Sequence, residues 1–291
     1  MGSKPKGIII PVVTAFTSDG KFDMKSQDNI TEFLSNAGIG GIFRLGYTGE
    51  YIDMTNELRR EIIADAGKSV QGTGIKTIIC INGDNYGQTV SNAYHAAQNN
   101  IDGVVVQVSR VNGLVDYTVL LEDLHKVSGL PVFLYINPGT ALNKEITPDQ
   151  IRETSELIAG VKVSDKLDNL RKYCKALEGT DTAVYAGNAM DIFNLDDLNI
   201  EGVVTGPANV FPEAWVKAWQ TKNPEEQKEL YGLFKQFREV YHNIPSGRNP
   251  IAAFKYVLAE NGILESSRCI KNNLDEKDKE YLSKSLDLIM I

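Results

Sequence analysis

The sequence alternates short apolar runs with longer stretches in which apolar residues recur at helical spacing. Most of the runs are almost continuously apolar, which indicates strands covered on both faces, as in a parallel sheet. Neighbouring parallel strands need a crossover connection, and that connection is normally a helix. The predicted strands are residues 8–13, 41–45, 77–81, 103–108, 131–135, 160–163, 183–185 and 202–205.

The stretches between the runs have the pattern of helices. Thr55 and Thr147 stand where N-cap residues are expected, and Pro148 stands in the first turn of its helix. The repeated alternation predicts an α/β protein, a closed (β/α)8 TIM barrel, and an open doubly wound sheet is the alternative. The predicted helices in this part of the chain are residues 24–37, 56–69, 84–98, 116–128, 148–158 and 168–177.

The pattern changes after the last apolar run. Helices with no strand between them are predicted at residues 212–221, 224–242 and 250–261, and Asn223 is the N-cap of the second. No segment is low in complexity, and no linker separates two cores. We therefore expect residues 1–209 to form the barrel and residues 210–291 to form a C-terminal helical extension packed on the same domain.

The net charge and the cysteine usage narrow the function classes. Thirty basic residues against 38 acidic ones give a formal net charge of −8, so no overall attraction favours nucleic acid or an anionic membrane. No apolar run reaches the ~18 residues of a membrane span, and residues 1–6 lack the apolar stretch of a secretion signal. Cys80, Cys174 and Cys269 have no Cys-x-x-Cys spacing, which favours a reducing compartment. We expect a soluble cytoplasmic protein with no nucleic-acid or membrane partner.

Sequence motifs for metals and nucleotides are absent. There is no His-Glu-x-x-His, and the three histidines are scattered, so no zinc site is predicted. The glycines around Gly72 do not extend into a dinucleotide fingerprint, and the phosphate-loop and Gly-x-Ser-x-Gly patterns are also missing. We expect chemistry that needs neither a metal nor another cofactor.

Lys162 is the candidate nucleophile. It stands between two valines in a predicted strand, and lysine is almost never fully buried without a partner or a task. A site of low dielectric lowers the pKa of a lysine and makes its amine a nucleophile toward carbonyl carbon. Alternatively, the side chain lies at a frayed strand end and reaches water. The residues alone leave both interpretations open.

Two further candidates end predicted strands, where a barrel places its catalytic groups. The second run ends in Gly46-Tyr47-Thr48-Gly49-Glu50. The backbone N–H groups of such a turn suit a carboxylate or phosphate, and an ordinary glycine turn is the alternative. Tyr135 ends the fifth run, where it either transfers protons or bonds its hydroxyl to a backbone carbonyl.

Taken together, these segments resemble the pyruvate-dependent class I aldolases, the family of dihydrodipicolinate synthase and N-acetylneuraminate lyase. The resemblance spans almost the whole chain in the right order. Its specificity lies in the joint order and spacing of the motifs and not in any one of them. The segments that carry it are residues 46–50, 82–85, 135–138, 160–162, 202–209 and 249–262.

The resemblance implies a barrel with a helical tail that forms a homo-oligomer, a dimer or tetramer. It implies that Lys162 forms a Schiff base with the keto group of pyruvate or another 2-keto acid, and that Tyr135 relays protons. It also implies that the backbone N–H groups of Tyr47 and Thr48 hold the substrate carboxylate, with the Thr48 hydroxyl near the Tyr135 phenol. The other substrate-binding candidates are Gly46, Gly49, Val204 and Thr205.

Departures from the family pattern concern the substrate more than the chemistry. Tyr47 stands where the family commonly has Thr or Ser. Residues 109–112, Ser-Arg-Val-Asn, stand in place of the aromatic pair of dihydrodipicolinate synthases, and Thr140 stands in place of their arginine. The family's Asn directly after the tyrosine is Ile136 here, and Asn137 follows one place later.

We therefore predict a Schiff-base-forming aldolase or lyase that cleaves or condenses a 2-keto acid, with pyruvate and an aldehyde as its small-molecule partners. A 2-keto-3-deoxy sugar acid is the favoured substrate. Dihydrodipicolinate synthase, which joins pyruvate and aspartate semialdehyde, is the alternative enzyme. A catalytically impaired barrel that senses a keto acid is the alternative from another class. Arg44 either faces the substrate or pairs with an acid, and Arg110 is given no role.

Overall fold

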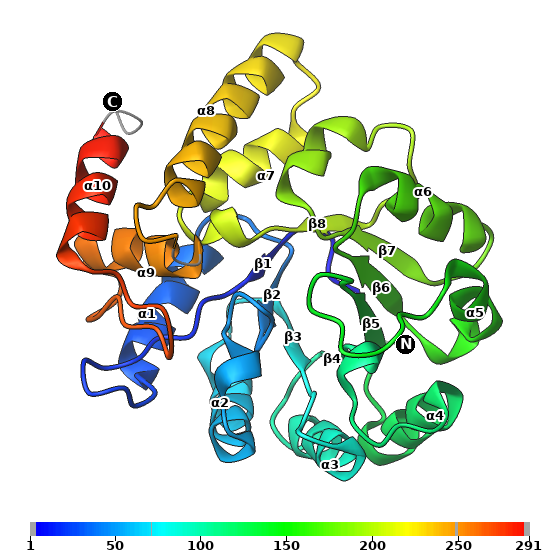
Figure 1. The fold of residues 1–291 in the computed structure, drawn as a ribbon. Helices are drawn as coiled ribbons and strands as arrows, with labels where there is room; N and C mark the ends of the chain where they lie inside the picture. Colours follow the sequence, from blue (N-terminus) through cyan, green and yellow to red (C-terminus); the bar gives the residue numbers. More distant parts are fainter. Residues whose placement is uncertain (1–3, 71, 248–249, 288–291) are drawn as a thin grey trace.

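The computed structural model describes residues 4–70, 72–247 and 250–287. Asn249, with which the C-terminal segment of the resemblance begins, lies outside the described residues. The strands form one closed parallel barrel in chain order (Figure 1), which confirms the predicted TIM barrel. β8 pairs with β1, so the open doubly wound sheet is wrong. The strands are β1 (Gly7–Pro11), β2 (Gly41–Arg44), β3 (Lys76–Cys80), β4 (Gly103–Val106), β5 (Val132–Ile136), β6 (Gly160–Val163), β7 (Ala183–Ala186) and β8 (Gly202–Val204).

Helices α1 to α6 connect successive strands up to β7, and the 3-10 helix η4 (Ala189–Asn194) connects β7 to β8. Their ends agree with the predictions to within two residues, α5 excepted. The predicted caps at Thr55 and Thr147 are confirmed, because their side chains accept hydrogen bonds from the first turns of α2 and α5. These helices are α1 (Met24–Ser35), α2 (Asn56–Ser69), α3 (Tyr86–Ala97), α4 (Tyr117–Ser128), α5 (Pro148–Glu153) and α6 (Leu167–Ala176).

The prediction of one helix over residues 148–158 is wrong, because α5 ends at Glu153 and a 3-10 turn, η3 (Ser155–Leu157), follows. Thr154 explains the early end. Its hydroxyl donates to the Gln150 carbonyl at 3.1 Å, and its backbone N–H donates to Ile151 instead. The side chain thus takes the acceptor that a continuing helix would use.

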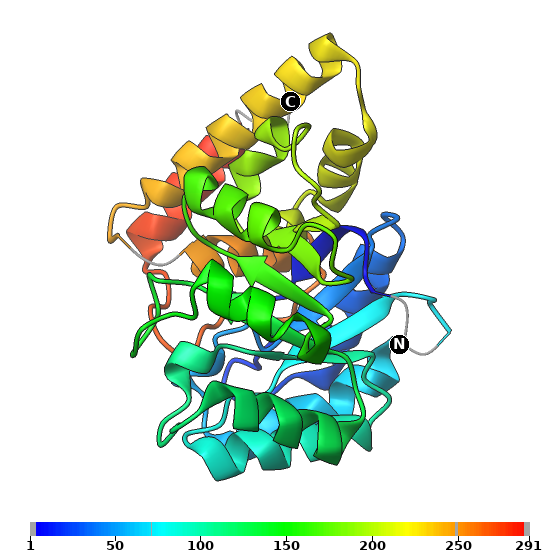
Figure 2. The same ribbon diagram turned by 90° about the vertical axis from the view of Figure 1, so that its right-hand side faces the viewer.

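The C-terminal helices gather on one side of the barrel, next to α1 (Figures 1 and 2). α7 contacts β1, α9 contacts the 3-10 helix η5 (Gly206–Asn209), and α10 contacts α8. α10 was not predicted because its sequence is mostly polar, and only a few apolar side chains such as Leu282 anchor it. The helices are α7 (Pro212–Gln220), α8 (Pro224–His242), α9 (Pro250–Glu260) and α10 (Glu276–Asp287). In the ranges given above, none of the helices is both long and apolar enough to cross a lipid bilayer.

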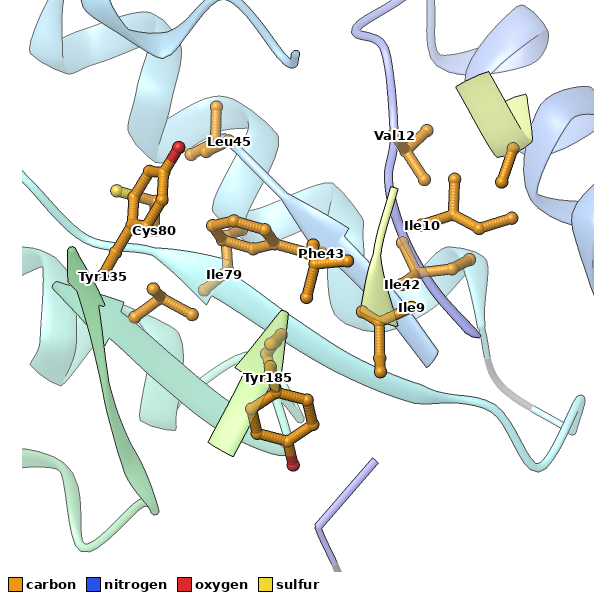
Figure 3. Packing of buried hydrophobic residues seen from close by; sticks show 14 of the residues in the cluster. Ile9, Ile10, Val12, Ile42, Phe43, Leu45, Ile79, Cys80, Tyr135 and Tyr185 are labelled. Carbon is orange, nitrogen blue, oxygen red and sulfur yellow. The ribbon is translucent and has the colours of Figure 1, made fainter. Parts of the chain in front are cut away.

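Aromatic side chains lie inside the barrel, between the strands (Figure 3). Tyr135 and Phe43 meet edge to face with their ring centroids 6.3 Å apart. Tyr185 meets Phe133 at 6.1 Å, and its hydroxyl donates to the Pro5 carbonyl at 2.9 Å. Because Pro5 precedes β1, this contact lies at the N-terminal end of the barrel, and the candidate site residues belong to the opposite end.

Candidate active site

Lys162 lies inside the barrel between two tyrosine-bearing strands. The register of β6 pairs it with Tyr135 of β5 and Tyr185 of β7. Its Nζ lies 4.0 Å from the centroid of the Tyr135 ring and 5.1 Å from that of Phe43. The residue is 8% exposed, so it does not lie at a frayed strand end. No hydrogen bond or ion pair reaches Nζ from any residue that the structure describes.

Burial lowers the pKa of the Lys162 amine to about 7, because the site desolvates the ammonium and places no carboxylate against it. Cys80 acts weakly in the opposite direction. Near pH 7 a large fraction of this amine is therefore unprotonated, whereas an exposed lysine is almost fully charged. The geometry and the pKa together make Lys162 a competent nucleophile toward a carbonyl carbon.

Tyr135 presents a protonated phenol beside this amine. The residue is buried, and its hydroxyl oxygen accepts a hydrogen bond of 2.8 Å from Asn137 Nδ2. Burial raises the pKa of the phenol to about 12, and hydrogen bonds with Ser164 and Asn137 act in the opposite direction. The Tyr135 hydroxyl thus retains its proton at neutral pH and can donate it to a reacting oxygen.

The turn after β2 has a backbone conformation set by residues on either side of it. Leu45 and Glu50 have φ of +54° and +63°, in the left-handed region that few non-glycine residues adopt. The Gly49 N–H donates to the Gly46 carbonyl, and the Glu50 N–H donates to the Tyr47 carbonyl, each at 3.0 Å. In the described ranges the Thr48 amide makes no hydrogen bond. It is therefore available to a ligand carboxylate.

A buried ion pair holds this turn against the C-terminal extension. The Glu50 carboxylate pairs with Lys255 of α9 and accepts a hydrogen bond of 2.8 Å from the Ile270 N–H. Lys255 is fully buried and also donates to the Arg268 carbonyl at 2.8 Å. Sequence analysis did not identify this pair. The available signal was a lysine within the apolar stretch of α9.

The loop after β8 meets the turn after β2. Val204 is buried at the end of β8, and the N–H of Thr205 donates to the Ile9 carbonyl at 3.1 Å. The Thr205 hydroxyl is buried and has no hydrogen-bond partner among the described residues. A Cβ placed on Gly206 would lie 3.3 Å from Thr48 Oγ1, so these two residues are in contact range.

The structure thus brings Lys162 and Tyr135 together, and it brings Thr48 to the loop after β8. Among the described residues, the Thr48 and Tyr135 side chains do not hydrogen-bond to each other. Sequence analysis gave no role to Phe43 or Asn137. Their positions along the strands could have identified them, because each lies on the inward side next to a residue of the site.

The two unexplained arginines do not contact Lys162. Arg44 points outward from β2, where its Nη2 donates to Thr31 at 3.2 Å and to Ser69 at 2.6 Å. Asp65 Oδ2 lies 3.9 Å from the same nitrogen. Of the two interpretations, Arg44 therefore pairs with an acid, and burial lowers its pKa to about 10. Arg110 donates to the Thr140 carbonyl.

The chain is similar to known proteins along almost its whole length. A model of the dihydrodipicolinate synthetase family matches residues 4–289. YjhH of Escherichia coli (strain K12), named provisionally as a 2-dehydro-3-deoxy-D-pentonate aldolase, is 29% identical over 232 residues, which cover 75% of each protein. YagE of the same strain, named provisionally as a 2-dehydro-3-deoxy-D-gluconate aldolase, is 28% identical over 250 residues, or 81% of each protein.

Solved structures agree in fold. The crystal structure of YagE in complex with pyruvate has a TM-score of 0.85 at 25% identity, with 98% of each chain covered. The dihydrodipicolinate synthase of Bacteroides thetaiotaomicron has a TM-score of 0.89 at 24% identity, with 99% of this chain and 100% of that chain covered. The second likeness concerns the fold alone.

Proposed function

Since the chain belongs to the dihydrodipicolinate synthetase family and is a class I aldolase or lyase, we propose that it cleaves or forms a 2-keto-3-deoxy sugar acid through a Schiff base on Lys162. The observation that carries this proposal is the Lys162 amine, which is buried against two aromatic rings with its pKa lowered to about 7. A buried amine of this kind does not stabilise the fold, but it is a good nucleophile for attack on a ketone.

The proposed reaction assigns a task to each group of the site. The Lys162 amine adds to the keto carbon, and the Tyr135 phenol protonates the hydroxyl that leaves as water. The Thr48 and Tyr47 amides hold the substrate carboxylate. The cationic Schiff base then withdraws electrons, so that cleavage of the neighbouring C–C bond gives an enamine and an aldehyde. Proton transfer by a positioned phenol contributes roughly 10²–10⁴-fold to the rate.

Two observations support a hydroxylated substrate. Both Escherichia coli relatives are named for 2-dehydro-3-deoxy sugar acids, whereas the pyruvate bound in the YagE structure supports only the keto-acid part of the substrate. Thr205 Oγ1 and Asp191 Oδ2 follow β8 and β7, and both are buried without a hydrogen-bond partner in the described part of the chain. Thr205 precedes Gly206, which lies in contact range of Thr48, and it therefore offers a polar contact to a substrate hydroxyl. Thr140 stands where dihydrodipicolinate synthases have an arginine, so that enzyme remains the alternative.

Three expectations from the sequence belong to the same proposal. They are one domain that comprises the barrel (1–209) and the extension (210–291), a homo-oligomeric state of two or four subunits, and a cytoplasmic location. Limited proteolysis, light scattering and cell fractionation test them in turn. Two stable fragments, a monomer at micromolar concentration, or recovery outside the cytoplasm would each overturn one of them.

The decisive experiment is reduction with borohydride in the presence of pyruvate, followed by peptide mass mapping. We expect one reduced pyruvyl adduct, on Lys162, which Lys162→Ala abolishes. Lys166→Ala is the matched control, because Lys166 is an exposed lysine close in sequence, and it should retain the adduct. Absence of an adduct in the wild type would overturn the proposal.

Aldehyde specificity separates the three candidate functions. We expect turnover of pyruvate with glycolaldehyde or glyceraldehyde, the products of cleaving a 2-keto-3-deoxy pentonate or gluconate. Faster turnover with aspartate semialdehyde would favour a dihydrodipicolinate synthase. Adduct formation without turnover of any of these aldehydes would favour the keto-acid sensor.

A further inference from the structure

Asn137 contacts the proton donor of the proposed reaction directly. It follows β5 two positions after Tyr135, and residues two apart on an extended strand project to the same side. Its Nδ2 lies 2.8 Å from the phenol oxygen. We propose that Asn137 is a positioning residue that orients the Tyr135 hydroxyl for proton transfer. This inference rests on the proposed function and adds a residue to it.

Neighbouring loops hold the backbone of Asn137 on both sides. Its N–H donates to Glu145 Oε1 at 2.9 Å. Its carbonyl accepts from the Thr140 N–H at 3.0 Å and from Gln107 Nε2 at 3.3 Å. Gln107 is itself fully buried, and its Oε1 accepts from the Tyr51 hydroxyl at 3.1 Å. The donor amide is therefore fixed relative to β4 and β5 before any ligand binds, which is what positioning requires.

The contact has a defined effect on the phenolic proton. Because Asn137 Nδ2–H donates to the phenol oxygen, the O–H of Tyr135 points away from Asn137. Ser164 also hydrogen-bonds with this phenol, so Asn137 is one of two side chains that hold it. The hydrogen bond from Asn137 strengthens when the phenol loses its proton, since a charged acceptor binds a donor more tightly than a neutral one. Asn137 thus stabilises the phenolate that the first proton transfer produces and the second one consumes.

The Tyr135 phenol gives up its proton in Schiff-base formation and regains one in cleavage. In Schiff-base formation the Tyr135 proton goes to the carbinolamine hydroxyl, which leaves as water with the C–O electron pair, while the lysine nitrogen lone pair forms the C=N bond. In cleavage the phenolate takes the proton of the C4 hydroxyl, and its O–H pair forms the aldehyde C=O. The C3–C4 pair moves toward the iminium to give the enamine, and the phenol is restored.

Two substitutions separate hydrogen-bond donation from a structural role. Asn137→Leu removes the donor and keeps a similar side-chain length. Asn137→Asp keeps the shape and suits the same turn, but its carboxylate accepts a hydrogen bond and cannot donate one. We expect each to lower kcat by roughly 10- to 100-fold, the range of a hydrogen bond to a charged group. The KM for pyruvate should change by less than about threefold.

A double-mutant cycle with Tyr135→Phe tests whether Asn137 acts through the phenol. In the Tyr135→Phe background, Asn137→Leu should lower kcat by less than about threefold. The matched control is Asn143→Ala, an exposed asparagine of the same connecting loop whose Nδ2 donates to the Ser109 carbonyl at 3.1 Å. It should leave kcat unchanged. Thermal unfolding of each variant checks that the fold is retained.

The outcomes are distinct. Wild-type kcat in Asn137→Asp, or an equal loss from Asn137→Leu in both backgrounds, would overturn the positioning role and leave the proposed function intact. A wild-type protein that forms no pyruvate adduct would overturn the proposed function, and this role with it. Loss in Asn137→Leu and Asn137→Asp that disappears in the Tyr135→Phe background would support both.

Discussion

Burial disfavours the charged form of the Lys162 amine, and this determines how the reactivity of the amine depends on pH. Its pKa is lowered to about 7 by burial. The rate of trapping by cyanoborohydride with pyruvate should therefore rise about tenfold per pH unit below 7 and level off above it. Initial rates at constant ionic strength measure this dependence. A rate that keeps rising up to about pH 10 would indicate an ordinary exposed lysine.

The same burial costs stability, and the cost depends on pH. The folded protein holds this lysine with a pKa of about 7, against the ordinary value of 10.5, so the unfolded chain binds more protons between these values. The free energy of unfolding therefore rises with pH through that window and is lowest below pH 7. Lys162→Met removes the charge and keeps most of the volume.

We expect Lys162→Met to be more stable than the wild type at pH 6, by a few kcal/mol, and this advantage to shrink toward pH 9.5. Chemical denaturation at the two pH values measures the difference. The variant should form no pyruvate adduct. A variant less stable than the wild type at both pH values would mean that the amine makes stabilising contacts in its charged form.

At the scale of elements, the turn after β2 depends on a position with no room for a side chain. A Cβ on Gly46 would lie 2.9 Å from Phe43 Cε1, and the Phe43 ring contacts Lys162. We expect Gly46→Ala to shift this ring, to destabilise the fold by about 1–3 kcal/mol, and to raise the KM for pyruvate. Steady-state kinetics and thermal unfolding measure both effects.

A glycine with room for a Cβ provides the control for this substitution. At Gly87, in the first turn of α3, the nearest atom to a new Cβ is Asn85 Oδ1 at 3.6 Å. Gly87→Ala should be neutral or stabilise by about 0.5–1 kcal/mol, since a helical glycine loses more backbone entropy on folding than alanine. Equal behaviour of the two variants would contradict a steric role for Gly46.

The elements that the sequence predicted are those in which burial and local preference agree. The strands are apolar on both faces, and the capped helices carry their signal in a few residues such as Thr55 and Thr147. The sequence did not predict η4 or α10, because short 3-10 turns lack a periodic pattern and α10 is mostly polar. Its packing on α8 is tertiary and cannot be seen in a local pattern.

The sequence predicted only those residues of the site whose chemistry is unusual for their position. Lys162 and Tyr135 are conspicuous in apolar strands, and the resemblance to a family gave them roles. The Asn137 contact with the phenol and the Glu50–Lys255 pair depend on side-chain directions and on segments far apart in the chain. No spacing in the sequence encodes such contacts.

For the whole molecule, the Glu50–Lys255 pair links the extension to the turn after β2. We expect Glu50→Gln to cost about 3–5 kcal/mol, because it leaves the fully buried Lys255 without a counter-charge. Glu50→Gln combined with Lys255→Met should recover much of this loss, since no charge then remains buried. Denaturant unfolding of the single and double variants measures the coupling.

A surface pair serves as the comparison. Lys222 and Asp196 are 2.8 Å apart and both 76% exposed, so Lys222→Ala should change stability by less than about 1 kcal/mol. If Glu50→Gln were equally mild, the extension would be held by apolar packing alone, and the turn would not depend on its charge.

The contact between the Tyr185 hydroxyl and the Pro5 carbonyl lies at the N-terminal end of the barrel, and the proposed site uses the opposite end. We expect substrates to approach the Lys162 amine from the carboxyl ends of the strands, where barrels place their catalytic groups. In the proposed cleavage, the aldehyde fragment leaves while the remaining carbons are still bonded to the Lys162 nitrogen. The proposed Schiff base therefore predicts that pyruvate is the last product to leave and, in the condensation direction, the first reactant to bind. Product-inhibition patterns would record that sequence.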